Sequence, residues 1–202
     1  QTRPDISYAV HQACRFLRCA GTPHKDNLRR IVRYLRGSSK LALYFTLEDS
    51  GRRKGPPVAA DQLSAFVDAD WGGDPVKGKS TSGWVVFLAG GPVAWGVSLQ
   101  SVIAQSTTEA EYIALNFCLK DLFWFKQLLE FLGHSQQTIP VMEDNAGCID
   151  WSEGRMNHKR SKHVKLKYHW NQQCVEEGWV KIHPVGTTHQ IADIFTKGAI
   201  AK

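Results

Sequence analysis

The feature that most limits the possible folds is a long amphipathic pattern set between short apolar runs. Residues 108–132 place their apolar side chains on one helical stripe, and Gly133 ends the pattern. Short apolar runs on either side are typical of strands. The combination predicts an α/β domain with a mixed sheet. The stripe consists of Ala110, Ile113, Ala114, Phe117, Trp124, Leu128 and Leu132.

The short apolar runs predict the strands of this sheet. Two of them flank Gly90-Gly91-Pro92, which predicts a hairpin. Residues 102–104 are a further strand candidate. The predicted strands cover residues 63–67, 84–89, 93–97, 139–142 and 179–182.

Three further helical patterns follow the long one. The first begins at Asn145, and the second runs from about Lys162 to Glu177. Thr187 and Gln190 have the spacing of a capping box, which predicts a last helix up to Gly198.

A second unit precedes this domain. Residues 6–17 and 28–35 have helical periodicity, Gly37 ends the second pattern, and residues 41–47 predict a short strand. The Gly- and Pro-rich stretch 51–57 is typical of a linker. We therefore predict a mostly helical unit over residues 1–57 and an α/β domain over residues 58–202.

The charge is divided between the two predicted units. The protein has a formal net charge of +6, and residues 1–57 carry 12 Lys/Arg against 4 Asp/Glu. Residues 58–202 carry 13 Lys/Arg against 15 Asp/Glu. The basic unit suits a polyanionic partner, although a solvated basic face explains the same composition.

Cysteine usage and apolar run length argue against several classes of protein. The 5 cysteines are scattered and form no C-x-x-C pair, so a disulfide framework is not expected and a reducing compartment is. The apolar runs are too short to span a bilayer, and no secretion signal opens the chain. We expect no membrane partner. Because the chain begins at Gln1, we also expect a part of a longer polypeptide.

Two acidic residues follow predicted strands. Asp68 comes after residues 63–67, and Asp144 comes shortly after residues 139–142. Sites in open α/β sheets gather at the carboxyl ends of strands, so both carboxylates are candidates for one site. Taken singly, each is more often an ordinary turn residue.

Other acids can join this pair. Glu109 and Glu111 flank the apolar stripe of the long helix on opposite sides, so periodicity does not choose between them. Asp193 lies beside the apolar face of the last helix. Carboxylates brought together repel unless a cation binds them, and hard oxygen ligands favour Mg²⁺ or Mn²⁺. Two such ions, roughly 3.5–4 Å apart, can clamp the attacking and leaving oxygens of a phosphodiester.

The histidine and basic residues between Arg155 and His169 have a different interpretation. His158, His163 and His169 lack the paired spacing of a zinc site. Six basic residues surround them, and no acid lies between Gly154 and Val175. Such a run can follow a nucleic-acid backbone, and a solvated basic helix is the alternative. The six are Arg155, Lys159, Arg160, Lys162, Lys165 and Lys167.

Five blocks of the sequence resemble, in the same order along the chain, parts of the ribonuclease H domain of copia-type retrotransposon Pol polyproteins. The resemblance covers nearly all of residues 61–198, and segments 2–6 and 33–37 also resemble the end of the preceding reverse transcriptase, without its catalytic motifs. The five blocks are 67–74 with 79–84, 105–115, 143–146, 158–163 and 190–197.

The resemblance implies a fold and an activity. It implies a ribonuclease H-like fold, a mixed five-stranded sheet with helices on both faces, preceded by the small helical unit. It also implies a metal-dependent endonuclease that hydrolyses the RNA strand of RNA–DNA hybrids during reverse transcription. Two Mg²⁺ or Mn²⁺ ions and no small-molecule cofactor are expected. The partners would be the hybrid and the reverse transcriptase of the same polyprotein, in a cytoplasmic virus-like particle.

The same resemblance assigns residues. It selects Glu111 over Glu109, and it gives His183 a role in product release for which His189 competes. Asp70 is a possible outer residue of the site. The implied metal ligands are Asp68, Glu111, Asp144 and Asp193. The implied hybrid contacts are Lys79, Ser80, Ser82, Asn145, Arg155, Lys159, Arg160, Lys162, His163 and Lys165.

One departure and two alternatives accompany this assignment. Glu143 replaces a small or sulfur-containing residue of the family pattern and adds negative charge beside the predicted metals. A non-catalytic hybrid-binding connection module would need the basic residues and not the acids, and all four acids are intact. An integrase-like relative would share the acids, but paired zinc-ligand cysteines are missing and the 190–197 block is present.

Overall fold

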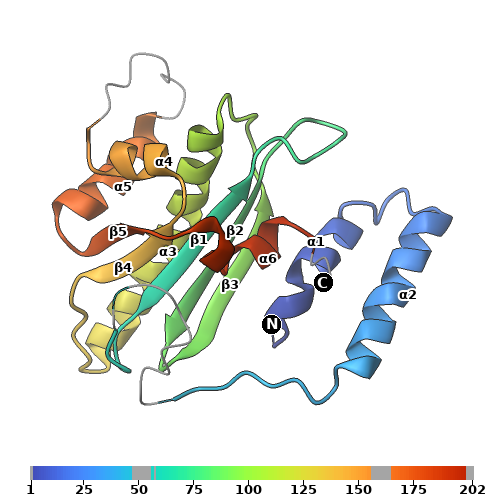
Figure 1. The fold of residues 1–202 in the computed structure, drawn as a ribbon, viewed down its shortest axis with the longest axis horizontal. Helices are drawn as coiled ribbons and strands as arrows, with labels where there is room; N and C mark the ends of the chain where they lie inside the picture. Colours follow the sequence, from blue (N-terminus) through green and yellow to red (C-terminus); the bar gives the residue numbers. More distant parts are fainter. Residues whose placement is uncertain (1, 47–55, 57, 156–164, 199–202) are drawn as a thin grey trace.

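The computed structural model describes residues 2–46, 56, 58–155 and 165–198, with side chains from His169 onward in the last range. A five-stranded sheet in the order β3-β2-β1-β4-β5 forms its centre (Figure 1). Strand β2 pairs antiparallel with both β3 and β1, whereas β1, β4 and β5 run parallel. The predicted mixed sheet is confirmed. The strands are β1 (Ser64–Asp70), β2 (Thr81–Leu88), β3 (Gly91–Leu99), β4 (Ile139–Glu143) and β5 (Val180–Pro184).

The hairpin between β2 and β3 is tighter than the sequence predicted. Leu88 pairs with Gly91, so Ala89 and Gly90 alone form the turn. Both have positive φ, 49° and 69°, as a two-residue turn that matches strand twist requires. Pro92 therefore lies inside β3. This strand is at the sheet edge, where a missing N–H is tolerated.

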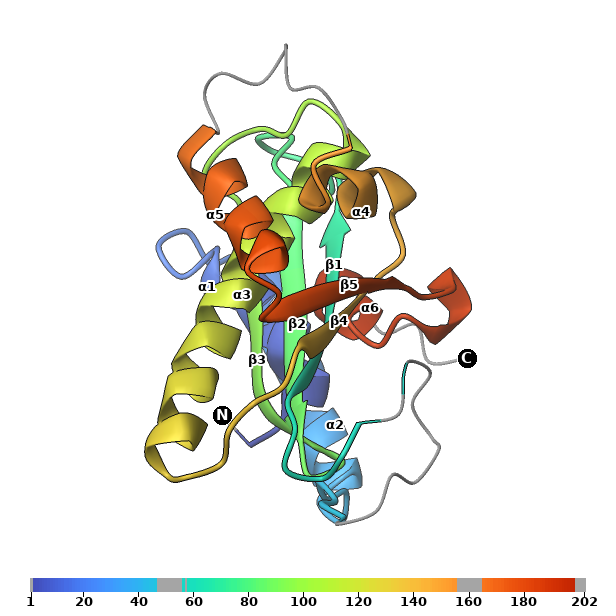
Figure 2. The ribbon, with the colours of Figure 1, turned by 90° about the vertical axis from the view of Figure 1, so that its left-hand side faces the viewer.

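Helices cover both faces of the sheet (Figure 2, viewed toward the β5 edge). The helix α3 (Thr107–Phe131), predicted from the apolar stripe, packs on β1 and β2, whereas α4 (Ala146–Ser152) and α5 (Lys165–Glu176) pack on α3 and β5. The short α6 (Asp193–Thr196) packs on the other face, and α1 (Ser7–Cys14) packs on β3 and α6. Side chains alternate along β1, so those on one face enter the core under α3 and those on the other face enter the core under α6.

These two cores differ in size. The larger lies under α3 and includes Val67, Leu115, Leu119 and Val141. The smaller lies under α6 and centres on Phe66, Phe87, Met142 and Phe195. Successive residues Phe66 and Val67 thus face opposite layers. Burial on both sides explains why β1 is a nearly continuous apolar run rather than an alternating one.

The predicted last helix is broken in two. Residues Thr187–His189 form a 3-10 turn, and α6 begins only at Asp193. Gln190 does not complete a capping box, because its Nε2 donates to Val67 O (2.8 Å) and its Oε1 accepts from Ala192 N (3.1 Å). A tertiary hydrogen bond to β1 has replaced the local one.

The N-terminal unit consists of a 3-10 turn (Pro4–Ile6), α1 and α2 (Thr22–Gly37). The predicted strand over residues 41–47 is wrong for its described part. Residues 41–46 form no strand, and Thr46 N donates to Ala89 O (2.7 Å) at the hairpin turn. The expected strand at 102–104 is also wrong. These residues are described and form no strand, and the preceding strand β3 ends at Leu99. None of the described helices is long and apolar enough to cross a membrane.

Candidate active site

Asp68 and Asp144 meet because β1 and β4 are parallel neighbours. Phe66 pairs with Met142, so two residues further along the strands Asp68 comes level with Asp144. Asp144 directly follows β4, as predicted. Asp68 does not follow its strand, because β1 continues to Asp70 opposite Thr81 of β2. Its backbone is therefore held by sheet pairing rather than by a turn.

Glu111 completes a group of three carboxylates. Oxygen atoms of Asp68, Glu111 and Asp144 all lie within 4.8 Å of one another. We call these residues the acidic triad. Glu109 lies on the same helix turn but bonds to Gln105 N (2.8 Å) through its Oε2. The structure therefore separates two glutamates that periodicity could not.

The acidic triad has the electrostatics of a cation site. Burial, more than the neighbouring carboxylates, raises the pKa of Asp68 to about 6 and that of Glu111 to about 11. Glu111 Oε2 is buried without a hydrogen-bond partner. Buried acids that share a site ionise together only when a cation compensates them, so this group of oxygen ligands fits a divalent metal such as Mg²⁺.

Besides the triad and Asp193, a further carboxyl group, that of Glu143, lies next to Asp144 in the sequence. The Glu143 side chain is fully buried, one oxygen accepts from Asn145 N (3.0 Å), and the other has no partner. Burial, followed by the nearby Asp144, raises its pKa to about 8. Burial therefore opposes the ionisation of Glu143, and the negative charge expected beside the site develops only as the pH rises toward that value.

Asp193 lies near the triad but is not one of the three grouped carboxylates. Its Oδ1 accepts from Lys197 Nζ (2.6 Å), and the same ammonium is 3.8 Å from Asp68 Oδ2. The Thr196 hydroxyl also donates to Asp68 Oδ2. Thr196 and Lys197 are site residues that the assignment missed. The 190–197 block contained them, but only the packing of α6 against β1 reveals their contact with Asp68.

Relatives of known description cover this chain from end to end. No family model matches it. The Pol polyprotein of transposon TNT 1-94 from Nicotiana tabacum is 37% identical over 97% of this chain, and that of transposon RE1 from Arabidopsis thaliana is 34% identical over 97%. This chain belongs to the family of retrovirus-related transposon Pol polyproteins. It spans only 14% and 13% of the lengths of these two relatives.

Solved structures of other proteins share the fold of this chain. The N-terminal RNase H domain of a Mycobacterium tuberculosis protein superposes with a TM-score of 0.51 at 19% identity, covering 67% of this chain and 90% of that one. LC11-RNase H1, isolated from compost, gives 0.53 at 19% identity, covering 69% and 96%. The Pol chain therefore has the ribonuclease H fold that its sequence predicted.

The residues predicted to contact the hybrid differ from one another in burial and in hydrogen bonding. Ser80 and Ser82 are fully buried, and their hydroxyls accept from Gly72 N and Gln100 Nε2, which argues against direct ligand contact. Lys79 donates to Ser101 O at the surface (2.6 Å). Asn145 caps α4 by accepting from Cys148 N (3.0 Å).

Only part of the predicted basic segment, residues 155–167, lies within the described residues. Arg155 is exposed and pairs with Asp150 (3.0 Å) and with Glu153. Four other predicted contacts, Lys159, Arg160, Lys162 and His163, lie outside the described residues, and so does the side chain of Lys165.

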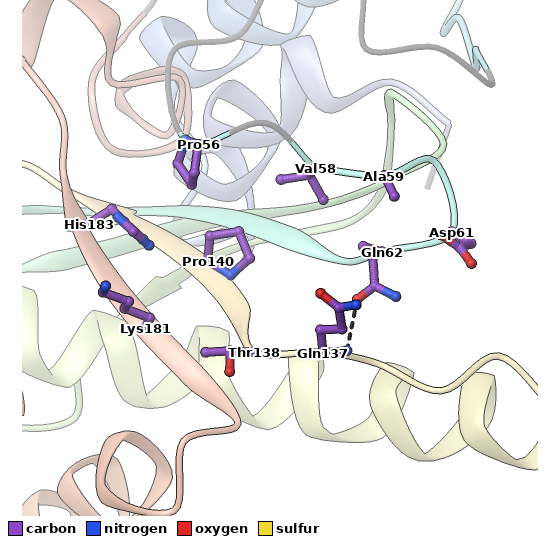
Figure 3. Close-up of a pocket in the computed structure, with 10 residues that line it drawn as sticks. All are labelled: Pro56, Val58, Ala59, Asp61, Gln62, Gln137, Thr138, Pro140, Lys181 and His183. Atoms are coloured by element: carbon purple, nitrogen blue, oxygen red, sulfur yellow. Dashed lines mark hydrogen bonds between the residues drawn. The ribbon is translucent and has the colours of Figure 1, made fainter.

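His183 is not grouped with the carboxylates of the acidic triad. It lies on β5 with Lys181 and faces a pocket that also includes Pro140 and Gln62, and no predicted metal ligand lines that pocket (Figure 3). Burial and Lys181 lower the pKa of His183. The competing His189 is exposed in the 3-10 turn after β5. The product-release role of either histidine stays a prediction.

Proposed function

We propose that this chain is the ribonuclease H part of a retrotransposon Pol polyprotein and hydrolyses the RNA strand of RNA–DNA hybrids. The observation that carries the proposal is the acidic triad, in which Asp68, Glu111 and Asp144 meet at one sheet edge. Three separate elements supply these oxygens, and a chain under no requirement to bind cations would not keep such a costly buried cluster. Family membership and the ribonuclease H fold support the same activity.

The proposed cofactor is a pair of Mg²⁺ or Mn²⁺ ions. When bound, such ions activate water and stabilise the departing oxygen of a phosphodiester. Asp68, Glu111 and Asp144 would hold them, with Asp193 as the fourth ligand. The protein's own contribution is to keep these carboxylates fixed: Asp68 by sheet pairing and Thr196, and Glu111 by the long α3.

The proposed partners follow from charge and from family membership. Lys79, Asn145 and Arg155 lie on loops or helix ends of the domain and would contact the hybrid. The crystal structure of LC11-RNase H1 is of a complex with an RNA/DNA hybrid. We also propose that the N-terminal unit joins the domain to the reverse transcriptase of the same polyprotein, inside a cytoplasmic particle of the element.

The alternative function is a non-catalytic hybrid-binding module. It would need the basic residues and leave the acids free to drift. The close approach of three intact acids favours the nuclease instead.

Asp144→Asn tests the proposal directly. This change keeps the shape of the side chain and removes one triad charge, so cleavage of a labelled RNA–DNA hybrid in Mg²⁺ should fall by about 100-fold or more, with hybrid affinity retained. The matched control is Asp61→Asn, at an exposed loop acid. Undiminished cleavage by Asp144→Asn would remove the nuclease proposal. Cleavage of duplex DNA at the same rate would remove the substrate assignment.

A further inference from the structure

The ammonium group of Lys197 lies beside two of the proposed metal ligands. Its Nζ is 2.6 Å from Asp193 Oδ1 and 3.8 Å from Asp68 Oδ2. Thr196, the preceding residue, donates to the same Asp68 oxygen and so holds the end of α6 against β1. This part of the site therefore already contains a positive charge.

Among the described residues, the other two members of the acidic triad, Glu111 and Asp144, pair with no cationic side chain, and Lys197 reaches only Asp68. The triad oxygens lie within 4.8 Å of one another, and buried Glu111 Oε2 makes no hydrogen bond. Asp68 belongs to both arrangements, because it lies in the triad and also faces Lys197. The four acids thus divide into a triad that needs a cation and an Asp193 carboxylate that has one.

Local helix stabilisation does not account for the Lys197 contacts. Asp193 and Lys197 have the i,i+4 spacing of a surface helix pair, but α6 is only four residues long. The approach to Asp68 joins residues from opposite ends of the domain. In addition, Gly83 of β2 keeps α6 close, since a Cβ there would be 2.7 Å from the Phe195 Cβ.

On the basis of the proposed function, we infer that Lys197 occupies in the free protein the cation position between Asp68 and Asp193. The free protein then binds one divalent ion, at the triad, and a second ion binds only when Lys197 moves away. The Lys197 side chain is 50% exposed on a flexible four-carbon stem, so it can leave without disturbing either core. Lys197 is a positioning residue that controls access to the second cation position.

The test is Mn²⁺ binding to the full chain without nucleic acid, measured by titration calorimetry. Wild type should bind one ion. Lys197→Met should bind a second ion about fivefold more tightly than wild type does, because a partly exposed ion pair contributes about 1 kcal/mol. Lys197→Arg keeps the charge and should behave as wild type. Adding Asp193→Asn to Lys197→Met should return the count to one ion.

Lys126→Met is the matched control, because Lys126 pairs with Glu130 at the same i,i+4 spacing far along α3 from Glu111. It should leave Mn²⁺ binding unchanged. Thermal unfolding of the metal-free variants checks that Lys197→Met folds.

Identical Mn²⁺ isotherms for wild type and Lys197→Met would overturn the role of Lys197, even if the protein cleaves hybrid. An altered count in a protein that does not cleave hybrid would support Lys197 and refute the nuclease. Two equal ions in wild type, or none in either protein, would also overturn the inference.

Discussion

The N-terminal unit and the ribonuclease H domain are both helical in large part, yet they are stabilised differently. No described residue among 2–46 is buried, whereas α3 of the domain alone buries 12. The helix α2 leaves Leu28 and Val32 49% and 64% exposed, and Figure 1 shows it lying away from the sheet. The domain has cores on both faces of its sheet, and the N-terminal unit has none of its own.

This difference teaches that helical periodicity predicts a helix but not what the helix packs against. An amphipathic helix is stabilised mainly when its apolar face is covered. In α3 the side chains of Leu115, Leu119 and Leu122 are buried in the larger core, although the stripe residues Trp124 and Leu128 further along the helix are exposed. In α2 much of the apolar face is open, and Arg15, just after α1, ties the unit to the domain by pairing with Asp74 (2.5 Å).

The sharpest test of this comparison is a pair of leucine truncations. Leu119→Ala removes a fully buried side chain from α3 and should lower the free energy of unfolding by about 3 kcal/mol. Leu28→Ala removes a 49% exposed side chain from α2 and should cost about 0.5 kcal/mol or less. Urea unfolding measures both. An equal cost at the two positions would mean that the N-terminal unit shares the cooperative core.

A second test uses the titration of the domain's buried acids; no acid is buried among the described residues 2–46. The folded pKa values of Asp68 and Glu143, about 6 and about 8, lie above their ordinary values of 3.8 and 4.5. The folded state therefore binds more protons than the unfolded chain between those values, so stability is greatest at low pH and falls as pH rises through the folded pKa values.

In EDTA, the melting temperature should fall by on the order of 5 °C between pH 5 and pH 8. Mg²⁺ should reduce that fall, because it compensates the ionised carboxylates. Glu143→Gln should flatten the profile, and Asp26→Asn, at an exposed acid of α2, should leave it unchanged. A melting temperature that rises with pH in EDTA would contradict the raised pKa values.

The smallest expected effect concerns the contact between the two regions. Arg15→Ala removes the ion pair with Asp74, so amide hydrogen exchange in α1 should become roughly fivefold faster while exchange in α3 stays the same. Arg29→Ala is the control, because Arg29 pairs only with nearby Asp26 on the exposed face of α2 among the described residues. Unchanged exchange in Arg15→Ala would show that other contacts hold α1 in place.

Local patterns were sufficient for most of the elements. The helix α3, the apolar runs of the strands and the position of Asp144 after β4 were all predicted, because each depends on neighbours in sequence. The predicted stripe was wrong for Trp124, Leu128 and Leu132, which are exposed. The errors came where a distant residue decides. The strand at 41–46 lacks a partner strand, and Gln190 bonds to Val67 rather than to its own helix.

The sequence by itself determined the fold class and the identity of the acids, through periodicity and resemblance. Periodicity left Glu109 and Glu111 open, and the resemblance selected Glu111. Only the tertiary structure brings Glu111 together with Asp68 and Asp144 and places Lys197 beside Asp68. The physical reason is range: a helix or strand follows from residues a few positions apart. A charge cluster instead depends on how α3, β4 and α6 pack against one strand, β1, and no local pattern records that packing.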